Sequence, residues 1–115
     1  MDLDKQLRDR YPYGHPDFIQ LCLEDMELHS SKNADYAKGG DPLGNFNRVS
    51  DILHRWGWDP LPHEVAFVYM MKQVDAVGNM LGQDYEGQTE GIKSRLQDIS
   101  VYAKLIEILY KKEHN

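Results

Sequence analysis

The chain has 115 residues, of which 41% are hydrophobic and 28% are charged, and its formal net charge is −6. This length allows one domain with one core, and the apolar content excludes global disorder. The acidic balance argues against nucleic acid and anionic membranes as partners, because both attract clustered Lys and Arg. We therefore expect a single domain over residues 1–115 that binds neither.

The sequence also predicts a cytoplasmic location. The single cysteine, Cys22, cannot form an intramolecular disulfide. No apolar run approaches the roughly 18 residues of a transmembrane helix. The first residues, Met1 to Asp4, are acidic and lack the apolar core of a signal peptide.

Glycine and proline divide the chain into an N-terminal arm, residues 1–15, and four predicted helices. The helices are expected at about 16–34, 45–56, 62–81 and 90–112. Pro16 and Pro62 suit a first helical turn, and Thr89 is a plausible N-cap for the last helix. No segment alternates with period two, and the loops are short. The sequence thus predicts an all-α fold, an antiparallel bundle of about four helices.

Apolar residues at helical spacing predict which helix faces are buried. The expected seam of the third helix consists of Phe67, Met70, Met71, Val74, Val77 and Leu81. The last helix has a broad apolar arc, and its expected solvent stripe consists of Lys93, Gln97, Ser100, Lys104, Glu107 and Lys111.

Asp98 lies in the middle of the apolar arc of the last helix, and Arg95 lies inside the same arc. An isolated buried carboxylate is costly, so Asp98 needs a cation, a metal or hydrogen-bond donors. Two interpretations remain open: a structural pair with Arg95 or a bridge to another helix, and a functional site.

The third helix places Lys72, Asp75 and Asn79 on one stripe beside its seam. This stripe fits either a solvated flank or one side of a site between helices. On the first predicted helix, Glu24 and Glu27 are three residues apart and can reach one ion, although amphipathicity alone makes them a solvated face.

Asp25 and His29 are spaced four apart inside the apolar arc of the same helix. We expect them to form a core pair rather than to serve as ligands.

The acidic residues indicate a class of chemistry. Carboxylates on helices, without the Cys–His spacing of a zinc site, suit Mg²⁺ or Mn²⁺. Such ions are usually held by a few carboxylates together with substrate phosphates. Lys32, Lys72 and Arg95 would neutralise phosphate charge. A phosphorylated small molecule is therefore the expected ligand.

Four segments, in this order, resemble a known family: Lys32 to Ala37 (KNADYA), Asn45–Phe46, Met70 to Asp75 (MMKQVD) and Leu96 to Ala103 (LQDISVYA). With their helical context they span about residues 18–109. On these residues the chain resembles the small phage-encoded members of the MazG-like all-α nucleoside triphosphate pyrophosphohydrolase superfamily.

The resemblance implies a homodimer or homotetramer that uses Mg²⁺ to hydrolyse (d)NTP to (d)NMP and pyrophosphate. The family's metal motif is Glu-Glu-x-x-Glu on one helix and Glu-x-x-Asp on a later one. Glu24 and Glu27 match its Glu-x-x-Glu part, but Leu28 stands where the third acidic residue belongs. The second motif is also incomplete: Lys72-x-x-Asp75 and Arg95-x-x-Asp98 keep the aspartate and replace the glutamate by a base.

This resemblance implies roles for individual residues. Metal ligands are expected at Glu24, Glu27, Asp75 and Asp98, with one of the two glutamates as general base. Triphosphate contacts are expected at Lys72, Asn79 and Arg95, and further substrate contacts at Lys32, Asp35, Tyr36, Asn45 and Tyr102. If the protein is phage-encoded, it acts in the host cytoplasm.

Two other functions remain open. The basic residues in the second motif suggest a pocket that binds and sequesters a nucleotide without hydrolysing it. Alternatively, the chain is a helical interaction module whose acidic patches only increase solubility.

Overall fold

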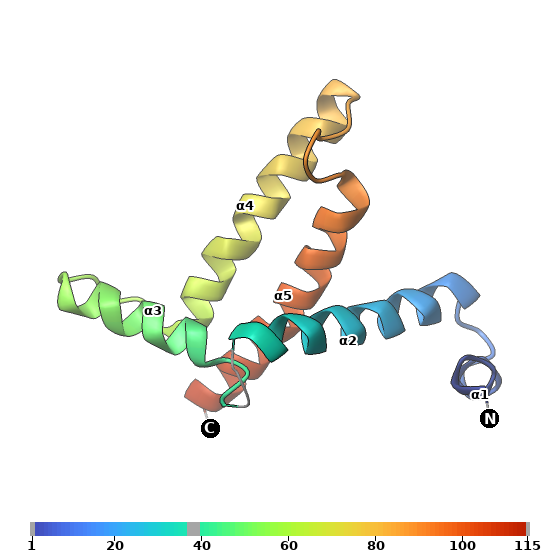
Figure 1. Ribbon diagram of the computed structural model, residues 1–115, viewed down its shortest axis with the longest axis horizontal. Helices are drawn as coiled ribbons and strands as arrows, with labels where there is room; N and C mark the ends of the chain where they lie inside the picture. Colours follow the sequence, from blue (N-terminus) through green and yellow to red (C-terminus); the bar gives the residue numbers. More distant parts are fainter. Residues whose placement is uncertain (1, 37–39, 115) are drawn as a thin grey trace.

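The chain folds into α-helices joined by loops, as the computed structural model in Figure 1 shows. The structure describes residues 2–36 and 40–114. Within them it has five helices and no strand: α1 (Leu3–Arg10), α2 (Pro16–Tyr36), α3 (Gly44–Arg55), α4 (Pro62–Gln83) and α5 (Ile92–Glu113). The predicted all-α class is confirmed. The segment expected as an N-terminal arm contains an additional helix, α1.

A carboxylate accepts a backbone hydrogen bond at the N-terminal end of both α4 and α5. α4 begins at Pro62, and the Glu64 carboxylate accepts a hydrogen bond from the Leu61 backbone N–H at 2.9 Å. α5 begins at Ile92, whose N–H donates to Glu86 at 3.0 Å. The N-cap prediction for Thr89 is wrong, because the loop folds back and brings Glu86 to this helix end instead.

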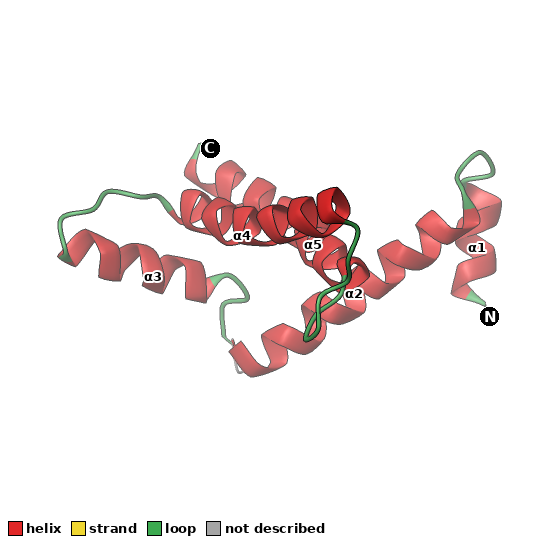
Figure 2. Cartoon of the chain, turned by 90° about the horizontal axis from the view of Figure 1, so that it is seen from above, coloured by secondary structure: helices red, strands yellow, loops and turns green. Residues whose placement is uncertain are grey.

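α4 and α5 form an antiparallel hairpin. His63, at the start of α4, hydrogen-bonds to Glu113 at the end of α5, and Gln73 meets Asp98 midway along. Figure 2 shows α3 and the C-terminal half of α2 on the same side of this hairpin. The N-terminal half of α2 carries α1 away from the hairpin (Figure 1). The result is a layered and open arrangement.

The core lies where α3, α4 and α5 meet. Its buried apolar residues are Leu43, Phe46, Val65, Ala66, Leu105 and Leu109. Beside them the rings of Phe46, Tyr69 and Tyr102 pack against one another, with centroids 6.0 to 6.5 Å apart. This small core fixes α3 and α5 relative to each other and so positions the residues between them.

The predicted seam of α4 is wrong for four of its six residues. Val77 is buried and Met70 is half-buried, but the other four side chains are exposed: Phe67, Met71, Val74 and Leu81. The helix is apolar on two faces, and α5 packs on the face that contains Ala66, Val77 and Met80. That face also holds Gln73, a polar residue whose hydrogen-bond partners on α5 make its burial tolerable.

The dimensions confirm that the described chain is not closely packed. Its radius of gyration is 16.7 Å, against about 13 Å for a compact domain of this length. None of the helices within the described ranges combines the length and apolarity that crossing a membrane requires.

Candidate functional site

α2, the start of α3 and α5 enclose a pocket of about 80 Å³. Its walls are formed by Leu28, His29, Lys32, Asn33, Pro42, Asn45, Phe46, Asp98, Val101, Tyr102 and Leu105. Four of these were expected to contact substrate or metal: Lys32, Asn45, Asp98 and Tyr102.

The turn before α3 sets the position of Asn45 and Phe46. The Asp41 carboxylate accepts a hydrogen bond from the Leu43 N–H at 3.0 Å, and the Asp41 carbonyl accepts one from the Gly44 N–H at 3.0 Å. Gly44 is buried, and a Cβ there would lie 3.0 Å from the Arg48 guanidinium. This tight turn starts α3 at the mouth of the pocket.

Asp98 is buried and its two oxygens have different partners. Oδ1 lies 3.1 Å from Lys32 Nζ on α2, and Oδ2 accepts a hydrogen bond from Gln73 Nε2 on α4 at 2.9 Å. Arg95 donates to Gln73 Oε1 at 2.6 Å and so reaches Asp98 through that amide. Of the structural alternatives, the bridge to another helix is therefore the one that forms. It also places a carboxylate and a half-exposed ammonium together at the pocket.

A second buried carboxylate, Asp25, ties α2 to α5 outside the pocket. It accepts hydrogen bonds from Ser100 Oγ at 2.6 Å and Lys104 Nζ at 3.3 Å. His29 instead lies against Asn33, whose amide donates to the His29 carbonyl at 3.0 Å. Each member of the predicted Asp25–His29 pair thus has another partner. Ser100 and Lys104, expected on the solvent stripe of the last helix, face α2.

The predicted metal ligands are spread over the molecule. Glu24 and Glu27 are exposed on α2, as amphipathicity predicts, and Asp75 is exposed on α4. Among the described residues, no three His, Cys, Asp or Glu side chains are close enough together to hold a metal ion. The side chains of a single described chain, as arranged here, therefore do not fit Mg²⁺ or Mn²⁺, and no chemical step is derived through a metal.

The other predicted substrate contacts divide into two groups. Arg95 is half-buried in the network around Asp98, whereas Asp35 on α2 and Lys72 and Asn79 on α4 are exposed and do not line the pocket. Tyr36 ends α2, and its side chain lies outside the described part.

Sequence reasoning missed His29, Asn33 and Gln73. Gln73 carried a detectable signal, because it is a polar residue at helical spacing from Ala66, Val77 and Met80 on α4. The same kind of signal identified Asp98. His29 and Asn33 are spaced four apart on α2, which identifies neighbours on a helix but does not show that they face a pocket.

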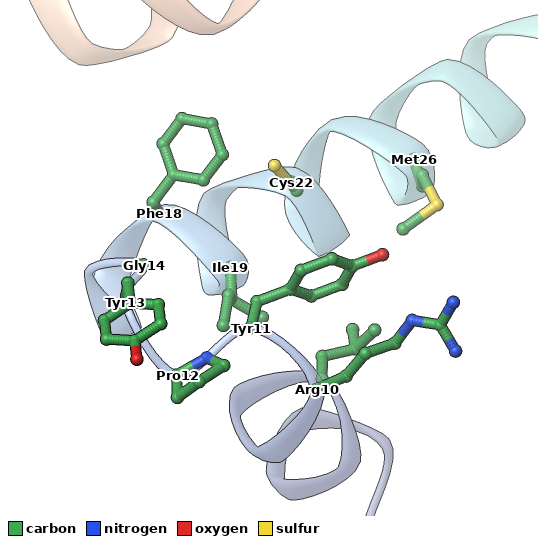
Figure 3. Close-up of a pocket in the computed structure, with 10 residues that line it drawn as sticks. Arg10, Tyr11, Pro12, Tyr13, Gly14, Phe18, Ile19, Cys22 and Met26 are labelled. Atoms are coloured by element: carbon green, nitrogen blue, oxygen red, sulfur yellow. The ribbon is translucent and has the colours of Figure 1, made fainter.

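A larger cavity, of about 690 Å³, lies between α1 and α2 (Figure 3). Its lining consists of Leu7, Arg10, Tyr11, Pro12, Tyr13, Gly14, Phe18, Ile19, Cys22 and Met26. The charged group among them, the Arg10 guanidinium, lies 5.8 Å from the centre of the Tyr11 ring. This lining offers apolar contact, and it includes none of the residues expected to bind substrate or metal.

The pocket beside Lys32 and Asp98 is therefore the best candidate for a functional site. The residues that line it and the resemblance found in the sequence both support this assignment. In comparisons with known proteins, no family model, no curated protein and no solved structure matches this chain.

Proposed function

We propose that this protein binds a nucleotide or another phosphorylated small molecule in the pocket between α2, α3 and α5. The observation that carries the proposal is the convergence of Lys32, Asn45, Asp98 and Tyr102, which come from three helices and line one pocket. Each was expected from the sequence to take part in ligand or metal binding.

Lys32 supports the phosphate part of this proposal. Its ammonium group has three N–H donors, and its side chain is half exposed, so a ligand at the mouth of the pocket can reach it. The neighbouring Asp98 repels an anion and also competes with it for Lys32. Binding of a phosphate group therefore requires Lys32 to exchange part of its interaction with Asp98 for the ligand.

The size and lining of the pocket indicate how a larger ligand would fit. A pocket of about 80 Å³ is smaller than typical small-molecule sites, which measure about 300–1,000 Å³. It can enclose one group of a nucleotide while the rest lies across the mouth. The amides of Asn33 and Asn45 have both donors and acceptors, which suits a base edge or sugar hydroxyls.

If the protein is an enzyme, we propose that it hydrolyses (d)NTP to (d)NMP and pyrophosphate with Mg²⁺ or Mn²⁺ as cofactor. A water molecule would attack the α-phosphorus, the bond from that phosphorus to the α–β bridging oxygen would break, and pyrophosphate would leave. The resemblance implies Glu24 or Glu27 as the general base that accepts the water's proton, although neither side chain lines the pocket. The resemblance and the buried carboxylate in the pocket support this activity. The scattered carboxylates favour the alternative, binding and sequestration without turnover.

We also propose that the protein forms a homodimer or homotetramer. It would act in the cytoplasm, or in the host cytoplasm if it is phage-encoded. The resemblance supports self-association, and so does the large exposed apolar surface of the chain.

Replacing Asp98 by Asn distinguishes hydrolysis of the nucleotide from binding without turnover. Asp98→Asn keeps the shape and removes the charge that competes for Lys32, so we expect metal-free nucleotide binding to tighten severalfold. If the protein is a pyrophosphohydrolase, the same variant loses metal-dependent pyrophosphate release that the wild type shows. Asp51→Asn, an equal charge change at an exposed position of α3, should alter neither property.

The measurements are calorimetric titration without metal and a pyrophosphate assay with each (d)NTP and Mg²⁺ or Mn²⁺. Intact nucleotide recovered after binding supports sequestration. A wild type that neither binds nor cleaves any of the nucleotides would contradict both hydrolysis and sequestration. The helical interaction module would then be the remaining alternative.

A further inference from the structure

The cavity between α1 and α2 has the size and the lining of a small-molecule site. Its volume of about 690 Å³ falls within the roughly 300–1,000 Å³ that such sites occupy. Its wall on α2 is apolar and consists of Phe18, Ile19, Cys22 and Met26. From Phe18 to Met26 this wall runs about 12 Å along the helix. A ligand that fills the cavity therefore needs an elongated apolar body.

Two polar groups of the lining lie together at one end of the cavity. Figure 3 shows the Arg10 guanidinium and the Tyr11 hydroxyl on the side of Met26, whereas Phe18 lies at the opposite end. The guanidinium is 5.8 Å from the centre of the Tyr11 ring. This arrangement matches a ligand with an apolar body and a polar group at one end.

Arg10 differs from the other two cations of α1 in its electrostatic surroundings. Arg8 lies 3.3 Å from the Asp4 carboxylate. Lys5 lies 3.9 Å from the carboxylate of Asp9. Within the part of the chain that the structure describes, Arg10 has no Asp or Glu at ion-pair distance, and its side chain is exposed. Its positive charge is therefore available to a ligand in the cavity.

We propose that this cavity binds a small amphipathic carboxylic acid, with the apolar chain between α1 and α2 and the carboxylate at Arg10. A guanidinium can donate two parallel hydrogen bonds to one carboxylate, and the Tyr11 hydroxyl supplies a further donor. None of the described residues that line the cavity is acidic, so the net charge of −6 does not repel the ligand at close range. The site is separate from the pocket beside Asp98, and the proposal does not depend on nucleotide binding.

The test is calorimetric titration of the full chain with decanoate, and with hexanoate and decan-1-ol as comparison ligands. We expect the affinity to rise about fourfold for each CH₂ added from hexanoate to decanoate, as burial of each methylene implies. Arg10→Gln should weaken decanoate binding at least about threefold and leave decan-1-ol binding unchanged. Arg8→Gln, the same change at a residue of α1 outside the cavity lining, should bind decanoate as the wild type does. Absence of decanoate binding, or equal decanoate affinity in wild type and Arg10→Gln, would overturn the proposal.

Alkylation of Cys22 shows where the acid binds. Cys22 is the single cysteine of the chain and is half-buried in the cavity wall, so its reaction with N-ethylmaleimide reports on this cavity. We expect saturating decanoate to slow the reaction severalfold. Decanoate that binds without protecting Cys22 would occupy another place on the chain and overturn the proposal. A reaction without decanoate that slows as protein concentration rises would mean that a second copy fills the cavity, which would also overturn it.

Discussion

Asp25 and Asp98 are both buried carboxylates, and different neighbours give them different roles. Asp25 is bound by Ser100 and Lys104 and joins α2 to α5, away from the pocket. Asp98 is held by Lys32 and Gln73 and lines the pocket. Each has charged or polar donors that offset the cost of burial. Burial alone therefore does not distinguish the two carboxylates, and only Asp98 lies beside a pocket with a half-exposed lysine.

Some residues of this site could be predicted from the sequence, but the contacts between them could not. Asp98 was detectable because a charged residue interrupts an apolar arc, and Lys32 because it is a base beyond the acidic middle of the first predicted helix. The contact between them was not detectable, since it joins α2 to α5 across 66 positions of the chain. Glu24 and Glu27 have the spacing for one ion, but spacing within a helix does not determine where that helix packs.

A substitution at Gly87 tests how tightly the loop before α5 is packed. A Cβ there would lie 2.2 Å from the Glu90 carbonyl oxygen and 2.7 Å from the end of Met80. Because the first of these atoms belongs to the backbone, Gly87→Ala should lower the free energy of unfolding by about 1–3 kcal/mol. In Gly82→Ala the new Cβ meets nothing within 4 Å, and that variant should be more stable by about 0.5–1 kcal/mol. Urea unfolding measures both, and equal effects would contradict this account of the loop.

At the scale of helices, sequence periodicity predicted where helices lie better than which faces they bury. The expected limits of the four main helices differ from the observed ones by at most two residues. Proline and glycine explain this agreement, because they act locally on the backbone. The prediction of the buried face of α4 was wrong because the helix has two apolar faces. Contacts with other elements decide which of the two α5 covers.

The tie between α2 and α5 can be measured by a double-mutant cycle. Asp25→Ala should lower the free energy of unfolding by about 1.5–3 kcal/mol, because it removes hydrogen bonds to a charged group. Ser100→Ala alone should cost less, since Lys104 still reaches Asp25. The coupling energy between the two changes should be at least about 0.5 kcal/mol. Additive effects would show that the Ser100–Asp25 bond does not stabilise the contact.

At the scale of the whole molecule, one chain leaves much of its apolar surface uncovered. α2 extends beyond the hairpin with α1 (Figure 1), and the 690 Å³ cavity lies between these two helices. α4 also exposes the apolar side chains of Phe67, Met71 and Leu81. Composition predicted one small core, but the open arrangement depends on long-range packing and was not predictable from helical periodicity.

The central claim, that the pocket beside Asp98 binds a phosphorylated ligand, is tested most directly by calorimetric titration of nucleoside triphosphates into the wild type and Lys32→Ala. We expect the wild type to bind and Lys32→Ala to lose at least about tenfold in affinity, which corresponds to about 1.4 kcal/mol. Lys93→Ala, the same change at an exposed position of α5, should bind as the wild type does. Binding that is equal in all three proteins, or absent from the wild type, would contradict the claim.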